Sequence, residues 1–95
     1  MHSPKHTHRT DEVKQSLLNR LNRLEGQVRG VKNMLENNEY CDDILTQVAA
    51  IKSALDAFSL TLFEDHMRNC VVRDIQANDP EILDEVLTTI KRLSR

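Results

Sequence analysis

Three side chains that bind soft metal ions, Cys41, His66 and Cys70, stand along one stretch of sequence with the pattern of a helix. From Asp42 to about Ile75 there is no proline or glycine, and apolar residues recur every three or four positions. At about 1.5 Å of rise per residue, Cys41 and His66 lie about 37 Å apart along such a helix, whereas His66 and Cys70 lie one turn apart. A site that uses all three therefore needs Cys41 from one subunit and the other two residues from a second subunit.

Two thiolates and one imidazole form a soft donor set. Thiolates favour Cu(I), whereas Zn(II) generally takes four ligands, so a three-coordinate Cu(I) ion suits this set. Two cysteines about 43 Å apart on one helix cannot form a disulfide within it, and their use as thiols fits a reducing compartment. The spacing leaves a second interpretation open, because both cysteines can pack as small apolar residues and His66 can be an ordinary interface residue.

Other potential donors are set aside. Met67 follows His66 directly and points to another side of the helix, so we expect it to fill a core or an interface. His2, His6 and His8 lie in a polar segment that fixes no geometry for them.

One all-helical domain behind a flexible tail is predicted to carry these residues. The chain has 95 residues, with two glycines, two prolines and 29% charged residues, a composition typical of a helix-rich soluble protein. Residues 1–10 are polar and lack a period, which predicts a flexible tail, and residues 11–95 form the domain. No apolar run approaches the roughly 18 residues of a membrane span, and there is no signal peptide, so we expect a cytoplasmic protein without a membrane partner.

Three helices account for the pattern of the domain. The first is predicted from about Asp11 to about Asn37, and the second from Cys41 to about Ile75. A short third helix follows Asp79 as N-cap, with a proline in its first position. Apolar residues in the first two helices alternate at spacings of four and three, which is the seam of a coiled coil or bundle. The seam contains Leu17, Leu21, Leu24, Val28, Val31, Leu35, Ile44, Val48, Ile51, Leu55, Phe58 and Leu62.

The second helix is too long for its own chain to cover. At about 34 residues it spans roughly 50 Å, while a compact globule of this size has a radius of gyration of about 12 Å. A symmetric dimer of two hairpins, forming an antiparallel four-helix bundle, covers it. If the helix crosses its copy near Asp56, Cys41 of one subunit lies beside His66 and Cys70 of the other, and the dimer holds two equivalent sites.

Charge is unevenly distributed along the chain. The net charge is −2, yet residues 14–32 hold five basic side chains against Glu25 alone, and residues 33–90 hold twelve acids against three bases. Such segregation fits an anionic partner on one face, although an ordinary solvated helix explains it equally well.

Three blocks then occur in order: RLNRLEGQVRG at 20–30, YC-x-DIL-x-Q at 40–47, and L-x-EDH-x-x-x-C at 62–70. With them, residues 18–71 resemble the copper-sensing CsoR branch of the CsoR/RcnR transcriptional repressors. The resemblance implies an all-helical hairpin dimer that pairs into a disc-shaped tetramer. It implies binding of operator DNA when metal-free, and dissociation on binding Cu(I), so that copper-export genes are transcribed.

The resemblance also implies roles for single residues. Three-coordinate Cu(I) would bridge two subunits through Cys41 of one and His66 and Cys70 of the other, with a copper chaperone as a further partner that donates the metal. Tyr40 and Glu81 match an outer pair that hydrogen-bonds the far nitrogen of the ligand histidine, with Glu85 as a competitor for Glu81. Such a bond would let the histidine report metal binding.

The basic residues of the first helix resemble the DNA-contacting surface of the family, with Arg20 foremost. Low aromatic content and no helix-turn-helix pattern favour reading of the DNA backbone and shape. The implied residues are Arg20, Arg23, Lys14, Arg29, Lys32, Lys91 and Arg92.

His66 and Cys70 also distinguish copper sensing from the other functions of the family. Reactive-sulfur sensors of the family keep the cysteines at positions 41 and 70 but lack the ligand histidine, so His66 favours copper. Nickel and cobalt sensors have histidine where Cys70 stands, and formaldehyde sensors lack that cysteine. A copper-buffering protein without a DNA role is the alternative from another class. An enzyme is not expected, because no nucleophile–base constellation is present.

Overall fold

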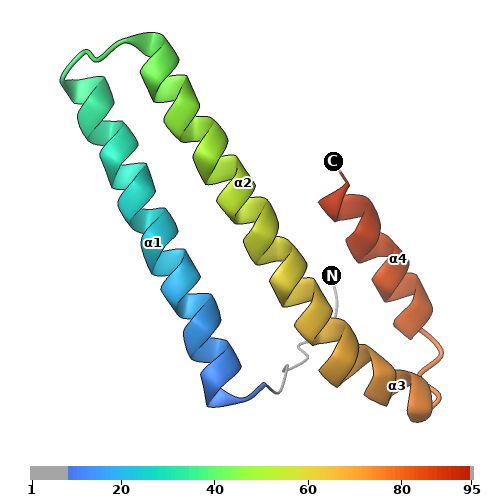
Figure 1. Ribbon diagram of the computed structural model, residues 1–95. Coiled ribbons are helices and arrows are strands. Elements are labelled where there is room, and N and C mark those ends of the chain that lie inside the picture. Colours follow the sequence, from blue (N-terminus) through green and yellow to red (C-terminus); the bar gives the residue numbers. More distant parts are fainter. Residues whose placement is uncertain (1–8, 95) are drawn as a thin grey trace.

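The computed structural model describes residues 9–94, and within this range every regular element is a helix (Figure 1). The elements are α1 (Asp11–Glu36), α2 (Cys41–His66), the π-helical turn η1 (Met67–Val71), α3 (Val72–Gln76) and α4 (Ile82–Leu93). The all-helical fold is as predicted. The chain is elongated, with extents of 55 × 29 × 20 Å and a radius of gyration of 17.3 Å.

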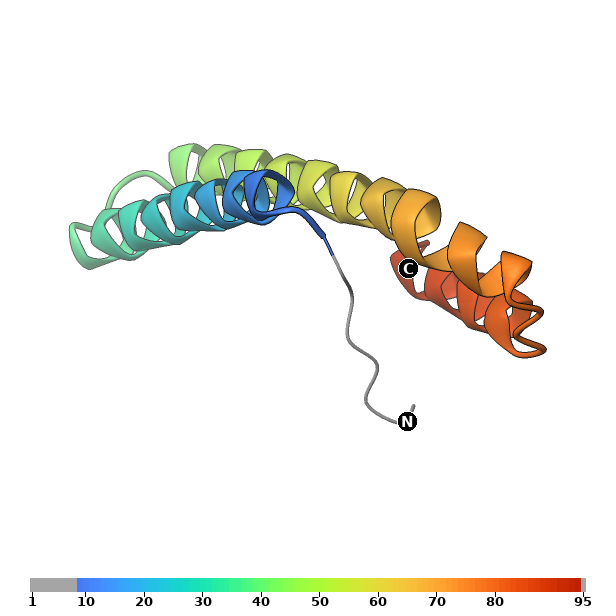
Figure 2. The same cartoon turned by 90° about the horizontal axis from the view of Figure 1, so that it is seen from below.

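α1 and α2 form an antiparallel hairpin, and α4 folds back beside the far end of α2 (Figures 1 and 2). α2, η1 and α3 follow one another without a break from Cys41 to Gln76, so they form a single long rod. The predicted second helix is therefore present. Its π-helical turn was not predicted, since no proline or glycine marks it.

Asparagines in a left-handed conformation end two of the helices. Asn38 has φ 54° and Asn78 has φ 60°. In each case the next residue donates its backbone N–H to a carbonyl five residues back, Glu39 to Met34 at 3.0 Å and Asp79 to Asp74 at 2.9 Å. Asparagine tolerates this conformation better than most residues, so these positions terminate α1 and α3.

Caps and acidic residues position the starts of the helices. Thr10 is the N-cap of α1, and its Oγ1 accepts from the N–H of Val13 at 3.2 Å. The predicted start of the last helix was wrong by two residues, because α4 begins at Ile82. Asp79 instead accepts at Oδ1 from the N–H of Glu81 at 3.0 Å, which stabilises the turn before the helix.

Little of the described chain is fully buried. The buried apolar residues are Leu17 and Leu24 on α1, Cys70 and Val71 in η1, and Ile82 at the start of α4. No residue of α2 is fully buried. Large apolar side chains are exposed on every long helix, among them Val28, Leu35, Leu45, Leu55, Leu60, Leu83, Leu87 and Leu93.

The expected flexible tail spans residues 1–10, of which residues 1–8 lie outside the described part, as do His2, His6 and His8. None of the helices in residues 9–94 combines the length and apolar character that crossing a membrane requires.

Candidate metal centre

The three predicted metal ligands lie at the two ends of α2. Cys41 is its first residue, His66 is its last, and Cys70 follows in η1. A helix of 26 residues separates the first two, so they lie about 37 Å apart. Within residues 9–94, no group of three or more His, Cys, Asp or Glu side chains comes together in a way that could hold a metal ion. One chain alone does not assemble the set.

The end of the rod that carries His66 and Cys70 is the more enclosed one. Cys70 is a free thiol with 5% of its surface exposed, and His66 is half-buried. The two ligands are separated by one turn, part of which is π-helical; there the N–H of Val72 reaches the carbonyl of Met67, five residues back. π-helical turns of this kind are frequent at functional sites. This end supplies one thiol and one imidazole on adjacent turns.

The other end is open. Cys41 is an exposed free thiol in the first turn of α2. Tyr40 is the N-cap residue, with 70% of its surface exposed and no side-chain capping bond. A partner can therefore reach Cys41 and Tyr40 without displacing any part of this chain.

The structure separates Tyr40 from the acids proposed to act with it. Tyr40 lies in the α1–α2 connection, whereas Glu81 lies directly before α4, near the opposite end of the rod (Figure 1). Glu81 and Glu85 line the same hollow beside Asp84 and Thr88. Both acids thus lie on one side of α4, and their position within one chain does not choose between them.

Asp65, which sequence reasoning did not single out, lies directly before His66. Its Oδ1 accepts from Asn69 Nδ2 at 2.8 Å, and its Oδ2 accepts from Arg9 Nε at 3.2 Å. The Asp65 side chain is 10% exposed. The spacing of Asp65 and Asn69 was a visible signal, since side chains four apart on a helix can meet. The contact with Arg9 had no such signal.

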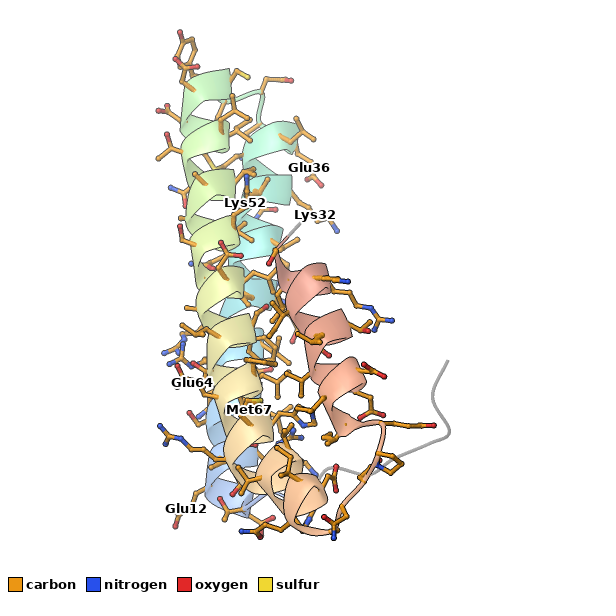
Figure 3. The ribbon with its side chains drawn as sticks, turned by 90° about the vertical axis from the view of Figure 1, so that its right-hand side faces the viewer. Glu12, Lys32, Glu36, Lys52, Glu64 and Met67 are labelled. Atoms are coloured by element: carbon orange, nitrogen blue, oxygen red, sulfur yellow. The ribbon has the colours of Figure 1, made fainter. Side chains whose placement is uncertain are left out.

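The basic residues of α1 lie on two sides of the helix. Arg20 and Arg23 line a hollow of about 110 Å³ against α2, together with Ala54. Arg29 and Lys32 line a different groove, and Figure 3 shows Lys32 extending outward from α1. The remaining predicted DNA contacts are exposed, at the start of α1 and in the last turn of α4: Lys14, Lys91 and Arg92.

The chain is similar to known proteins over nearly its whole length. The family model for metal-sensitive transcriptional repressors matches residues 13–92. The chain is 42% identical over 89 residues to the copper-sensing transcriptional repressor CsoR of Bacillus subtilis (strain 168), covering 93% of this chain and 88% of that protein.

Solved structures agree. The copper-sensing repressor CsoR with Cu(I) from Geobacillus thermodenitrificans NG80-2 superposes with a TM-score of 0.88 at 41% identity, with 95% of each chain covered. The nickel-responsive transcriptional regulator InrS superposes with a TM-score of 0.74 at 35% identity, covering 95% of this chain and 99% of that one. Cys41 and the His66–Cys70 turn, at the two ends of α2, both lie within residues 13–92, the range that the family model matches.

Proposed function

Because this chain belongs to the family of metal-sensitive transcriptional repressors, we propose that it is a copper-responsive member. It binds operator DNA when metal-free and dissociates when Cu(I) binds, so that copper-export genes are transcribed. One observation carries the choice of metal: the donors at the ends of α2 are two thiols and one imidazole, a soft set. Relatives that are named copper-sensing repressors support this choice of metal. These relatives are repressors and not enzymes, in agreement with the expectation that this chain is not an enzyme.

Cu(I) is proposed to lie between two subunits. Cys41 of one subunit and His66 and Cys70 of the other would hold it in three-coordination, since no fourth donor is required. The low exposure of Cys70 supports this role, because a thiolate shielded from water keeps competing ligands away from a soft ion.

Apolar exposure supports the assembly. α2 has no fully buried residue, and a groove of about 590 Å³ runs along the hairpin between α1 and α2, lined by Leu21, Val28, Ile51 and Leu55 among others. Two hairpins packed antiparallel across the middle of α2, near Asp56, would cover this groove and bring unlike ends of α2 together. Pairing of two such dimers into a tetramer would cover the apolar side of α4.

α4 is the proposed messenger. Few Cα atoms of α4 lie close to those of the other helices of its own chain, and of its residues only Ile82 is buried, which supports a helix that can shift its position. Tyr40 and Glu81, or Glu85 in its place, would hydrogen-bond the far nitrogen of His66 when copper is bound. That bond would draw the start of α4 towards the metal end of the rod.

Operator DNA is proposed to contact the basic residues of α1 and the last turn of α4, with Arg20 at the centre. Phosphate contacts of this kind make affinity fall steeply with salt. Since the partner is DNA, we place the protein in the cytoplasm, where a copper chaperone is a proposed metal donor.

The decisive experiment is an anaerobic operator titration with and without Cu(I). We expect tight binding without metal and loss of binding with one Cu(I) per subunit. Unchanged affinity in the presence of bound copper would contradict copper-responsive repression. Copper binding without any operator binding would favour the copper-buffering alternative, and release by a persulfide donor but not by Cu(I) would favour the reactive-sulfur sensor.

A further inference from the structure

A single carboxylate links the segment that enters α1 to the turn that carries His66 and Cys70. Asp65 uses both oxygens, Oδ2 for Arg9 Nε at 3.2 Å and Oδ1 for Asn69 Nδ2 at 2.8 Å. The bond to Arg9 joins residues 56 positions apart in the sequence, and the bond to Asn69 joins residues 4 positions apart.

Each partner of Asp65 directly precedes either the N-cap residue of α1 or a proposed metal ligand. Arg9 directly precedes Thr10, the N-cap of α1. Asn69 directly precedes Cys70 in η1. Arg9, Thr10 and Asn69 also line one hollow of about 290 Å³, so the start of α1 and η1 are neighbours in space.

The burial of this carboxylate gives the link its strength. The side chains of Asp65 and Arg9 are 10% and 23% exposed. A charged oxygen with so little access to water loses hydration that only its partners replace, so removing Arg9 leaves a poorly compensated charge beside the turn. The Asp65–Asn69 bond reaches from the residue before His66 into the π-helical turn and ends directly before Cys70.

We propose that Asp65 is a positioning residue that couples the docking of Arg9 to the shape of the His66–Cys70 turn. Docking of Arg9 stabilises the turn with Cys70 enclosed, and an altered turn releases Arg9 and loosens the first turn of α1. Because coupling is reciprocal, a ligand that weakens the docking of Arg9 is itself bound more weakly, by the same factor, when Arg9 is docked. For Cu(I) as that ligand the inference rests on the proposed function; for the metal-free protein it does not.

The test uses the full-length, metal-free protein and its Arg9→Gln variant, which keeps a polar side chain and the Asp65–Asn69 bond. Two quantities are measured: amide hydrogen exchange at Val13 and Lys14, whose N–H groups bond to Thr10, and the alkylation rate of Cys70 relative to its rate in the urea-unfolded protein. We expect both to rise about fivefold, the effect of losing a partly buried charged hydrogen bond. Arg9→Lys should restore most of the protection, because it returns the charge.

Glu64→Gln is the matched control. It removes one negative charge next to Asp65, from an exposed side chain on the side of α2 turned away from α4 (Figure 3). Both rates should stay at their wild-type values, and circular dichroism should give the same helix content for all variants. Faster exchange at Val13 and Lys14 with an unchanged Cys70 rate would overturn the coupling, as would an equal response of the Glu64→Gln variant.

Addition of Cu(I) separates this inference from the proposed function. We expect Cu(I) to raise exchange at Val13 and Lys14 in the wild type and to add nothing in Arg9→Gln. If Cu(I) releases operator DNA while exchange at these amides is unchanged, the link to the metal is wrong and the proposed function stands. If Cu(I) does not bind, the proposed function fails, and the metal-free result still decides the coupling.

Discussion

His66 differs from the two cysteines in having a second ring nitrogen, which can make a further bond when the first binds a metal. Thiolates alone can hold Cu(I), so among the three proposed ligands the imidazole is the one suited to carry the signal onward. Its place as the last residue of α2 puts it beside η1 and within reach of movements in the turn that follows.

His66→Ala is expected to keep Cu(I) bound through sulfur but to weaken copper-induced release of DNA at least about tenfold, or ~1.4 kcal/mol of coupling. The measurement is fluorescence anisotropy of labelled operator DNA under anaerobic conditions. Cys70→Ala serves as the comparison, because it should abolish both binding and release. Normal release by His66→Ala would count against a role of the imidazole in signalling.

Arg20 supports a second prediction at the scale of one residue. Arg20→Glu should lower operator affinity at least about tenfold and reduce the slope of affinity against salt, since a phosphate contact becomes a repulsion. Arg73→Glu, the same reversal on the exposed side of α3, is the control and should have a smaller effect. Equal losses in both variants would indicate that net charge, not the α1 surface, governs binding.

The candidate donor residues could be proposed from the sequence because their chemistry is a property of the side chain itself, and their meeting in one site stays a prediction. Asp65 could not, since its role depends on a contact with Arg9, 56 positions away. Likewise, the pattern names two acids near the start of α4, Glu81 and Glu85, and only an assembled site can distinguish them.

At the scale of the elements, helix ends are determined by a few residues with special backbone conformations. Asn38 and Asn78 adopt positive φ, while the neighbouring Asn37 has φ −87°. The break after α1 was predictable from the run of polar residues at 37–40. The π-helical turn was not, because it differs from an α-helix by a shift in hydrogen-bond partner that no residue type marks.

Asn38→Ala should destabilise the protein by about 1 kcal/mol, because a side chain with a Cβ and no local hydrogen bond is strained at positive φ. Asn38→Gly should be neutral or slightly stabilising. The measurement is urea unfolding at fixed protein concentration. Asn37→Ala is the matched control and should change stability by less than about 0.5 kcal/mol; an equal loss in both variants would argue against strain at position 38.

At the scale of the whole molecule, the chain is an elongated rod with few buried residues. Its radius of gyration, 17.3 Å, exceeds the roughly 12 Å of a compact globule of this size, and a few residues form its core. The length of the second helix predicted this, because a rod of roughly 50 Å cannot be enclosed by the rest of so short a chain.

Stability is therefore expected to depend on protein concentration. Thermal unfolding should shift to lower temperature on dilution, as it does when folding is linked to association. Leu55→Asp, at the middle of α2 and lining the groove, should yield a monomer of low stability by sedimentation, whereas Ser53→Asp should remain associated. A dilution-independent unfolding temperature with a single-chain sedimentation coefficient would contradict the proposed assembly.

Cys41 and His66 are the first and last residues of α2, so in the proposed assembly the length of this helix would determine the distance between the two metal sites. In an antiparallel pair that crosses at its midpoint, lengthening α2 symmetrically by one heptad would leave each two-subunit site intact. It would only move the two sites apart, by about 10 Å. Insertion of a single residue would instead rotate one end relative to the other and break both sites. In the proposed assembly, changes in the length of α2 would therefore be tolerated in whole heptads, and α2 would set the spacing between the two metal sites without altering their ligands.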